Sequence, residues 1–333
     1  MLQADTSSTT AMPQPLSCWP TQTATKPVSA PSWGGIDPGF STREYHPWGH
    51  VPRRIPSIAA DQIHAGSRGD MNTRSSNGKR GRRNEWRAGR IAVPGGDLCY
   101  GSIGTGPLII GLHGIQGTSA AWEEVGKLLS GSYTFVAPDM RGREPSIIPE
   151  ESAGYALPRF ADDLEALVTE IGRPAILMGW SMGVFVLFEY LRCGNHQPDG
   201  LVLTGGSAHL GRARWFHGPA VHDVEREARA RAARLGLDRT AEPYAVAETW
   251  FHVESSDYRD LLPAISAPTL ILHGAADDEC PPEHAELLAE RIPHAELEIW
   301  PQGGHNLMAH DPSRFASAVN RFFTDHRVRE TER

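Results

Sequence analysis

One pentapeptide in the chain has the residue types and spacing of a nucleophile turn. Gly179-Trp180-Ser181-Met182-Gly183 has the pattern G-x-S-x-G, with an apolar run ending at it and an apolar helical run beginning after it. A sharp strand-to-helix turn strains the backbone of the serine and leaves no room for side chains at the two glycines. It also exposes the hydroxyl at a helix N-terminus, where the helix dipole favours developing negative charge. We therefore expect Ser181 to be a nucleophile.

A serine nucleophile needs a base to take its proton and an acid to orient that base. Among fifteen histidines, His305 follows the last predicted strand in a glycine-rich loop, whereas His310 falls in the next helix. Asp277 lies where the loop after an earlier strand turns back into a helix, and Asp278 suits a helix cap. Loops that leave the carboxyl ends of parallel strands meet at one edge of a sheet. The sequence thus predicts Ser181, His305 and Asp277 as nucleophile, base and acid.

Acyl transfer also needs two backbone N–H groups aimed at one oxygen. Met182, directly after the nucleophile, supplies one of them. The loop His113-Gly114-Ile115-Gln116-Gly117 follows the strand predicted at 108–112, and we expect the Ile115 N–H to supply the other. His113 itself is expected to have a structural role beneath the site.

Six residues are candidates for lining the substrate pocket. Two of them flank the predicted machinery and four are aromatic residues of a later segment: Gln116, Trp180, Trp215, Phe216, Trp250 and Phe251. For the four aromatic residues of that segment, packing within the segment is an equal alternative. Their number favours an apolar or aromatic acyl group.

The elements that must position these residues predict an α/β fold, a mostly parallel mixed sheet with helices on both faces. A hairpin pattern at 90–93 and 98–103 comes first, and its strands give the sheet an antiparallel edge. Apolar strands then alternate with amphipathic helices. The strands are predicted at 108–112, 133–137, 175–179, 201–204, 269–272 and 295–300, and the helices at 119–129, 157–171, 182–192, 283–291 and 312–323. Residues 207–267 are too long for an ordinary connection and predict a helical cap.

Charge and composition divide the 333 residues, whose net charge is −8. Residues 1–90 carry a net positive charge and only 9 Leu, Ile, Val and Phe, too few to form a core. We predict a disordered tail at 1–87, a core at 88–206 and 268–327, a cap at 207–267 and a disordered end at 328–333. The tail holds four tryptophans that are candidates for docking segments: Trp19, Trp33, Trp48 and Trp86.

Several observations limit the location and the partners. The four cysteines share no short spacing, which favours a reducing compartment over a disulfide scaffold or a zinc site: Cys18, Cys99, Cys193 and Cys280. No apolar run approaches the roughly 20 residues of a membrane span, and no secretory signal follows Met1. The basic run Lys79-Arg80-Gly81-Arg82-Arg83 suits a solvated linker, so we expect no nucleic-acid partner. No metal-ligand spacing or dinucleotide-binding motif occurs. We expect a cytoplasmic protein that takes a small-molecule substrate and needs no metal or cofactor.

With these motifs in place, residues 88–327 resemble the α/β-hydrolases. The resemblance rests on the order Ser, Asp, His and on His113-Gly114, the stretch 179–183, the stretch 274–277 and Gly304-His305. The stretch 138–146 is similar to the family's D-x-R-G-x-G-x-S loop, with Glu144 in place of the second glycine and Ser146 kept. The resemblance implies a Ser181, Asp277, His305 triad. It also implies a single cap similar to that of small-molecule esterases, enol-lactonases and carbon–carbon hydrolases.

The residue at the nucleophile position narrows the family. Serine there excludes haloalkane dehalogenases and epoxide hydrolases, which have a carboxylate, and dienelactone hydrolases, which use cysteine. The sequence predicts a serine hydrolase that cleaves an ester, lactone or thioester of a small, apolar acyl substrate through an acyl-enzyme. Cofactor-free perhydrolysis, carbon–carbon hydrolysis and acyl transfer on the same triad stay open, as does a non-enzymatic ligand-binding role.

Overall fold

The structure is a computed structural model that describes residues 85–331, apart from residues 173–174, 196, 212, 214 and 238. The predicted tail up to residue 84, the first three tail tryptophans and the basic run therefore lie outside the described residues. None of the described helices is long and apolar enough to cross a membrane.

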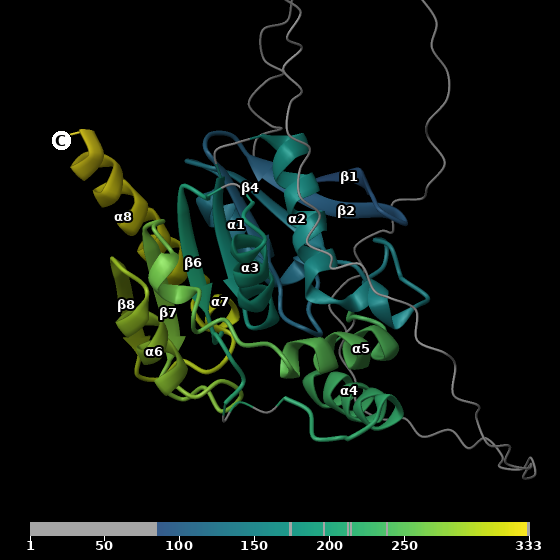
Figure 1. The fold of residues 1–333 in the computed structure, drawn as a ribbon. Helices are drawn as coiled ribbons and strands as arrows, with labels where there is room; N and C mark the ends of the chain where they lie inside the picture. Colours follow the sequence, from purple (N-terminus) through teal and green to yellow (C-terminus); the bar gives the residue numbers. More distant parts are fainter. Residues whose placement is uncertain are drawn as a thin grey trace, which may run out of the picture. The chain divides into compact units, whose positions relative to one another are not determined.

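Eight strands form one mixed sheet in the order β1-β2-β4-β3-β5-β6-β7-β8 (Figure 1). The strands are β1 (Arg87–Val93), β2 (Gly96–Gly104), β3 (Leu108–Leu112), β4 (Thr134–Asp139), β5 (Ala175–Trp180), β6 (Gly200–Thr204), β7 (Thr269–Gly274) and β8 (Ala295–Trp300). β2 pairs antiparallel with β1 and β4, and all other neighbours are parallel. This confirms the predicted fold class, with the hairpin at one edge.

Both ends of the folded part extend beyond the predicted boundaries. β1 begins at Arg87, and the ring of Trp86 packs edge-on against Phe135, with centroids 6.2 Å apart. At the other end, helix α8 (Pro312–Thr331) continues past residue 327, because no glycine or proline stops it.

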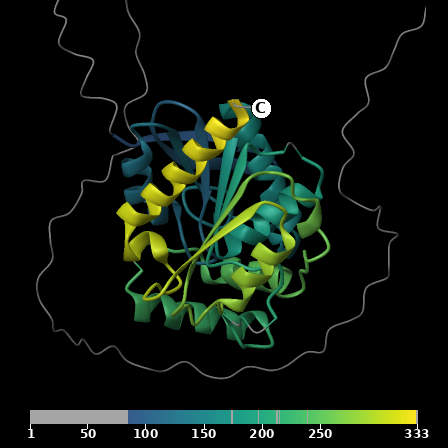
Figure 2. The same ribbon diagram turned by 90° about the vertical axis from the view of Figure 1, so that its left-hand side faces the viewer.

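Two apolar layers cover the sheet because successive strand residues point to opposite faces. On β5, Leu177 belongs to one buried cluster, while Ile176 and Met178 belong to the other. The first layer contains α2 (Leu157–Ile171), α3 (Met182–Arg192) and α6 (Glu283–Arg291); the second contains α1 (Glu123–Leu129), α7 (Leu307–His310) and α8. Figure 2 shows α8 running along its face of the sheet.

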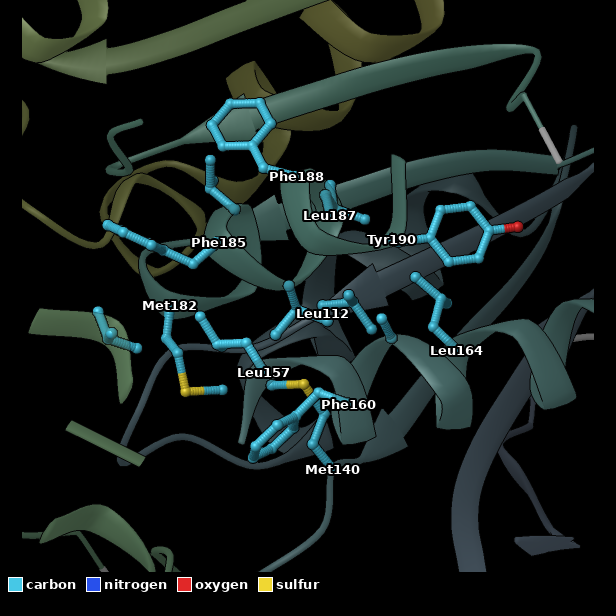
Figure 3. Packing of buried hydrophobic residues seen from close by; sticks show 14 of the residues in the cluster. Leu112, Met140, Leu157, Phe160, Leu164, Met182, Phe185, Leu187, Phe188 and Tyr190 are labelled. Atoms are coloured by element: carbon cyan, nitrogen blue, oxygen red, sulfur yellow. The ribbon is translucent and has the colours of Figure 1, made fainter. Parts of the chain in front are cut away.

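Helix α3, which follows the predicted nucleophile, is buried on nearly every side. Phe185, Leu187 and Phe188 have no exposed surface, and the helix packs against Leu157 and Phe160 of α2 (Figure 3). A helix that is apolar all round must be enclosed by other elements. This enclosure fixes the N-terminus of α3, and with it Ser181, in one position.

The segment 207–267, here called the insert, is helical as expected. It contains α4 (Val221–Leu235), α5 (Pro243–Glu254) and the 3₁₀ turn η3 (Leu262–Ala264). The two helices lie side by side (Figure 1). The insert contacts the loop after β3, since Gln116 Nε2 donates to the Ala228 carbonyl at 2.8 Å. Two further 3₁₀ turns, η1 (Ser119–Trp122) and η2 (Ser152–Tyr155), precede α1 and α2.

Candidate active site

Ser181 lies at a strained turn between β5 and α3. Its φ of 57° and ψ of −117° are unusual for a residue with a side chain. A Cβ on Gly179 would lie 2.8 Å from the Gly183 carbonyl carbon, and one on Gly183 would lie 2.5 Å from the Leu112 oxygen. The flanking positions therefore require glycine. The turn has the geometry expected from the sequence.

His305 and Asp277, which are 28 residues apart, meet at this edge of the sheet. His305 Nδ1 lies 2.9 Å and 3.1 Å from the two carboxylate oxygens of Asp277. Asp277 Oδ1 also accepts backbone N–H groups from Glu279 at 3.0 Å and Cys280 at 2.8 Å. Because Asp277 only accepts, the imidazole proton lies on Nδ1 and His305 Nε2 is left as an acceptor.

The Asp277 carboxylate is buried but remains ionised. Burial acts to raise the pKa of Asp277, while the hydrogen bond and charge of His305 and the Cys280 N–H lower it, and the net pKa lies below the usual value. An ionised carboxylate on Nδ1 stabilises an imidazolium that forms when Nε2 takes a proton.

The loop of His305 is held against the nucleophile turn. Trp180 Nε1 donates to the His305 carbonyl at 2.9 Å, and Ser181 N donates to Thr204 at 3.0 Å. Gly205 follows Thr204 with a φ of 54°, and a Cβ there would lie 2.9 Å from the His305 oxygen. Ser181 and His305 both line one cavity of about 470 Å³.

The peptide that carries the Ile115 N–H is fixed through its carbonyl. That carbonyl, Gly114 O, lies 2.8 Å from His113 Nδ1 and accepts the Gly117 N–H at 3.0 Å. His113 Nε2 accepts the Met140 N–H at 3.1 Å, so the His113 proton lies on Nδ1. Burial and Arg143 hold the pKa of His113 well below its usual range. Neutral His113 thus lies under the loop in the structural position expected for it.

Met182, the other predicted donor, is the first residue of α3, so its N–H has no partner within the helix. Met182 and Ile115 share a neighbour that sequence reasoning missed. Arg143 is fully buried, donates to the Ile115 carbonyl and lies 3.9 Å from the Met182 sulfur. Burial lowers the pKa of Arg143 to about 10, which keeps it charged at neutral pH. In the sequence, the only signal for Arg143 was its location in the stretch 138–146, which is similar to a loop of the α/β-hydrolases.

Two of the six predicted pocket residues, Gln116 and Trp180, line the cavity. The four aromatic residues of the insert are not among the lining residues. Trp215 and Phe216 pack against Trp250 in tilted and edge-on arrangements, with ring centroids 5.6 Å and 5.5 Å apart, and Phe251 packs against the same buried cluster. These rings join the buried cluster that covers this face of the sheet, and Trp215 also packs edge-on against Phe185 of α3, so they attach the insert to the core.

The insert instead presents charged and aliphatic residues to the cavity: Arg231, Leu235, Leu237 and Arg239. Arg231 Nη1 donates to Gln116 Oε1 at 2.8 Å, and its Nη2 lies 2.5 Å and 2.6 Å from the carboxylate oxygens of Glu279. A sequence signal existed, since 224, 228, 231 and 235 share one face of α4 and the first two are buried. The sequence analysis took its pocket candidates in this segment from the aromatic residues alone, and so missed Arg231.

Among residues 85–331 outside the short gaps, no group of three or more His, Cys, Asp or Glu side chains could hold a metal ion.

Comparison with known proteins identifies the class. A model of the alpha/beta hydrolase family matches residues 109–318, so the chain belongs to this family. It is 30% identical over 246 residues to a putative non-heme chloroperoxidase from Synechocystis sp., covering 63% of this chain and 88% of that protein. It is 29% identical to the serine hydrolase BPHL of Mus musculus, covering 71% of this chain and 84% of that one. Its structure is similar to that of the esterase RhEst1 from Rhodococcus sp., with a TM-score of 0.59, 26% identity, and 72% and 98% of the two chains covered. The protein is an enzyme of the hydrolase class.

Proposed function

We propose that this hydrolase cleaves a small carboxylic ester, lactone or thioester through an acyl-enzyme on Ser181. The observation that supports this most is the bond from His305 Nδ1 to ionised Asp277, which leaves Nε2 as an acceptor in the cavity that Ser181 lines. An imidazole oriented in this way is the base that a serine nucleophile requires.

In the proposed reaction, the Ser181 oxygen attacks the substrate carbonyl carbon while its proton passes to His305 Nε2. The carbonyl oxygen gains the negative charge and is stabilised by the backbone N–H groups of Ile115 and Met182. Collapse breaks the bond to the leaving group, which takes the proton from His305. Water activated by His305 then releases the acid and restores Ser181.

The cavity suggests the size of the acyl group. Its volume of about 470 Å³ suits a small molecule, and part of its wall is apolar: Ile115, Ala120, Ala121, Trp180, Leu235 and Leu237. In this proposal the insert acts as the cap of the site, and it contributes Arg231, Leu235, Leu237 and Arg239 to the wall of the cavity that Ser181 also lines.

The test is a panel of chromogenic esters and lactones, together with a fluorophosphonate label, on the full chain and on Ser181→Ala. We expect the variant to lose labelling and to lose turnover by about 10⁴–10⁶-fold. Ser255→Ala, an exposed serine at the end of α5, is the matched control and should behave as wild type. Turnover or labelling that survives in Ser181→Ala would overturn the proposal.

A second candidate is perhydrolysis, in which hydrogen peroxide replaces water as the attacker of the acyl-enzyme and releases a peracid. The relative named as a non-heme chloroperoxidase favours it. Peracid formed from acetate and hydrogen peroxide by wild type, and abolished in Ser181→Ala, would support this activity. If wild type forms no peracid and the acyl-enzyme reacts with water alone, perhydrolysis is excluded.

A further inference from the structure

A carboxylate faces the nitrogen of His305 through which each proton of the proposed reaction passes. Glu279 Oε2 lies 3.6 Å from His305 Nε2. The His305 side chain is 9% exposed and that of Glu279 is 27% exposed, so water screens this contact only in part. In the resting enzyme, both atoms are acceptors and form no hydrogen bond. When Nε2 takes a proton, the contact becomes an attraction between opposite charges.

Glu279 is held in this position from across the cavity. Arg231 of α4 binds both of its carboxylate oxygens, at 2.5 Å and 2.6 Å, and its own side chain is 17% exposed. The same guanidinium donates to Gln116, next to the predicted donor Ile115. Arg231 therefore fixes the carboxylate and also weakens the negative field that His305 experiences.

From this geometry we propose that Glu279 and Arg231 are a pair of positioning residues that sets the protonation of His305, with Glu279 stabilising the imidazolium and Arg231 limiting that effect. This inference rests on the proposed function for its kinetic consequence only. It places opposite charges in balance at the reacting nitrogen, so that His305 gains its proton from Ser181 readily and still returns it to the leaving group.

Other charged and titratable groups also face His305 from the elements around it. Asp277 holds Nδ1, and buried His273 of β7 lies 3.5 Å from Asp277. Burial lowers the pKa of His273 and keeps it neutral. Arg239 of the insert lines the same cavity and lies 3.3 Å from Asp139. Of the charged groups named here, Glu279 is the one that faces His305 Nε2, at 3.6 Å.

The test measures kcat/KM for an ester substrate as a function of pH. The quantity compared is the midpoint of the acid limb, the pH at which kcat/KM has fallen to half of its plateau on the acidic side. In Glu279→Gln, the imidazolium loses its anion and faces Arg231, so the midpoint of the limb moves down by about one pH unit. The plateau kcat falls about tenfold for the same reason. In Arg231→Met, the carboxylate acts without compensation, so the midpoint moves up. The Arg231→Lys variant keeps the charge and the wild-type midpoint.

Asp278→Asn is the matched control, because Asp278 is an exposed acid in the same loop; it should leave the limb in place. If a substitution only destabilises the protein or weakens substrate binding, activity falls. The acid-limb midpoints of Glu279→Gln and Arg231→Met then do not move in opposite directions. Shifts in the same direction, or no shift in either variant, would overturn the inference.

An NMR titration of the His305 ring, assigned by its loss in His305→Asn, repeats the comparison without turnover. Opposite shifts there support the inference even if no ester is cleaved. Active enzyme with unshifted titrations would refute the inference and leave the proposed function standing.

Discussion

At the scale of single residues, the two oxygens of Asp277 both contact His305 but differ in their other hydrogen bonds. Oδ1 accepts the Glu279 and Cys280 N–H groups, while Oδ2 makes the shorter contact with His305 Nδ1. The backbone bonds to Oδ1 hold the carboxylate in place, and Oδ2 orients the base. Asp278, its neighbour, is exposed.

Asp277→Asn therefore separates folding from catalysis. The amide oxygen keeps the two backbone bonds, whereas the amide N–H₂ meets Nδ1 and moves the imidazole proton to Nε2. We expect kcat to fall by about 10⁴-fold with a small change in thermal midpoint. Asp278→Asn should cost less than about threefold. Kinetics and thermal melts of both variants check this, and the reverse order of effects would place the acid at 278.

At the scale of elements, α4 is joined to the loop after β3 by polar contacts. Gln116 Nε2 donates to Ala228, its Oε1 accepts from Arg231, and its backbone carbonyl accepts from Thr240 Oγ1 at 2.9 Å. Gln116 was predicted to contact substrate. In the structure its side chain is buried, and its amide connects the insert to the core through hydrogen bonds.

Gln116→Ala removes the two side-chain hydrogen bonds to α4 and should increase the mobility of this helix. We expect faster hydrogen exchange of the α4 amides and a kcat/KM lowered by about tenfold, since each lost buried hydrogen bond contributes about 1 kcal/mol. Arg234→Ala, an exposed position on the same helix, is the control. Unchanged exchange in Gln116→Ala would show that apolar packing of the insert against the core is enough to fix α4.

At the scale of the whole molecule, Trp86 lies just before β1, near the start of the residues that the structure describes. Its ring packs against Phe135, and a Cβ on Gly101 or Gly126 would lie 2.9 Å or 2.6 Å from it. Both positions are glycine, which leaves a surface into which this ring fits closely.

A chain that starts at Asn84 should keep the thermal midpoint and turnover of the full chain, because residues 1–83 have too few large aliphatic side chains to share the core. A chain that starts at Ala88 loses Trp86 and should melt about 5 °C lower. Thermal melts and ester turnover of the three chains check this. A large drop already at Asn84 would show that the tail docks on the domain.

Buried neutral histidines also predict how the stability of the molecule depends on pH. Folding holds the pKa of His113 well below 6.5. Below about pH 6.5, the unfolded chain therefore binds a proton at His113 that the native chain does not bind. Stability is thus fully present above about pH 6.5 and falls by about 1.4 kcal/mol per pH unit below it.

Denaturant unfolding of wild type and His113→Asn between pH 7 and 5 measures this slope. In the variant, this slope should correspond to about one proton fewer taken up on unfolding than in wild type, whatever the variant's absolute stability. His222→Asn, which changes an exposed histidine, should retain the wild-type slope. An unchanged slope in His113→Asn would mean that His113 is protonated in the folded state.

The sequence by itself predicted a mostly parallel sheet with an antiparallel edge, the turn at Ser181 and the loops that bring Asp277 and His305 to one edge. These features follow from short-range rules: alternation in strands, helical periodicity, and the lack of space beside a strained turn. Only the tertiary structure decided which side chains line the cavity. Arg231 meets Gln116 across 115 positions and Glu279 across 48, and no local pattern encodes such pairs. Helical periodicity puts Arg231 on the same face of α4 as Val224 and Ala228, but only the packing of the insert shows that this face is buried and what it meets. The insert buries its aromatic rings in the cluster that it shares with α3, and a charged pair, Arg231 and Glu279, lies beside His305.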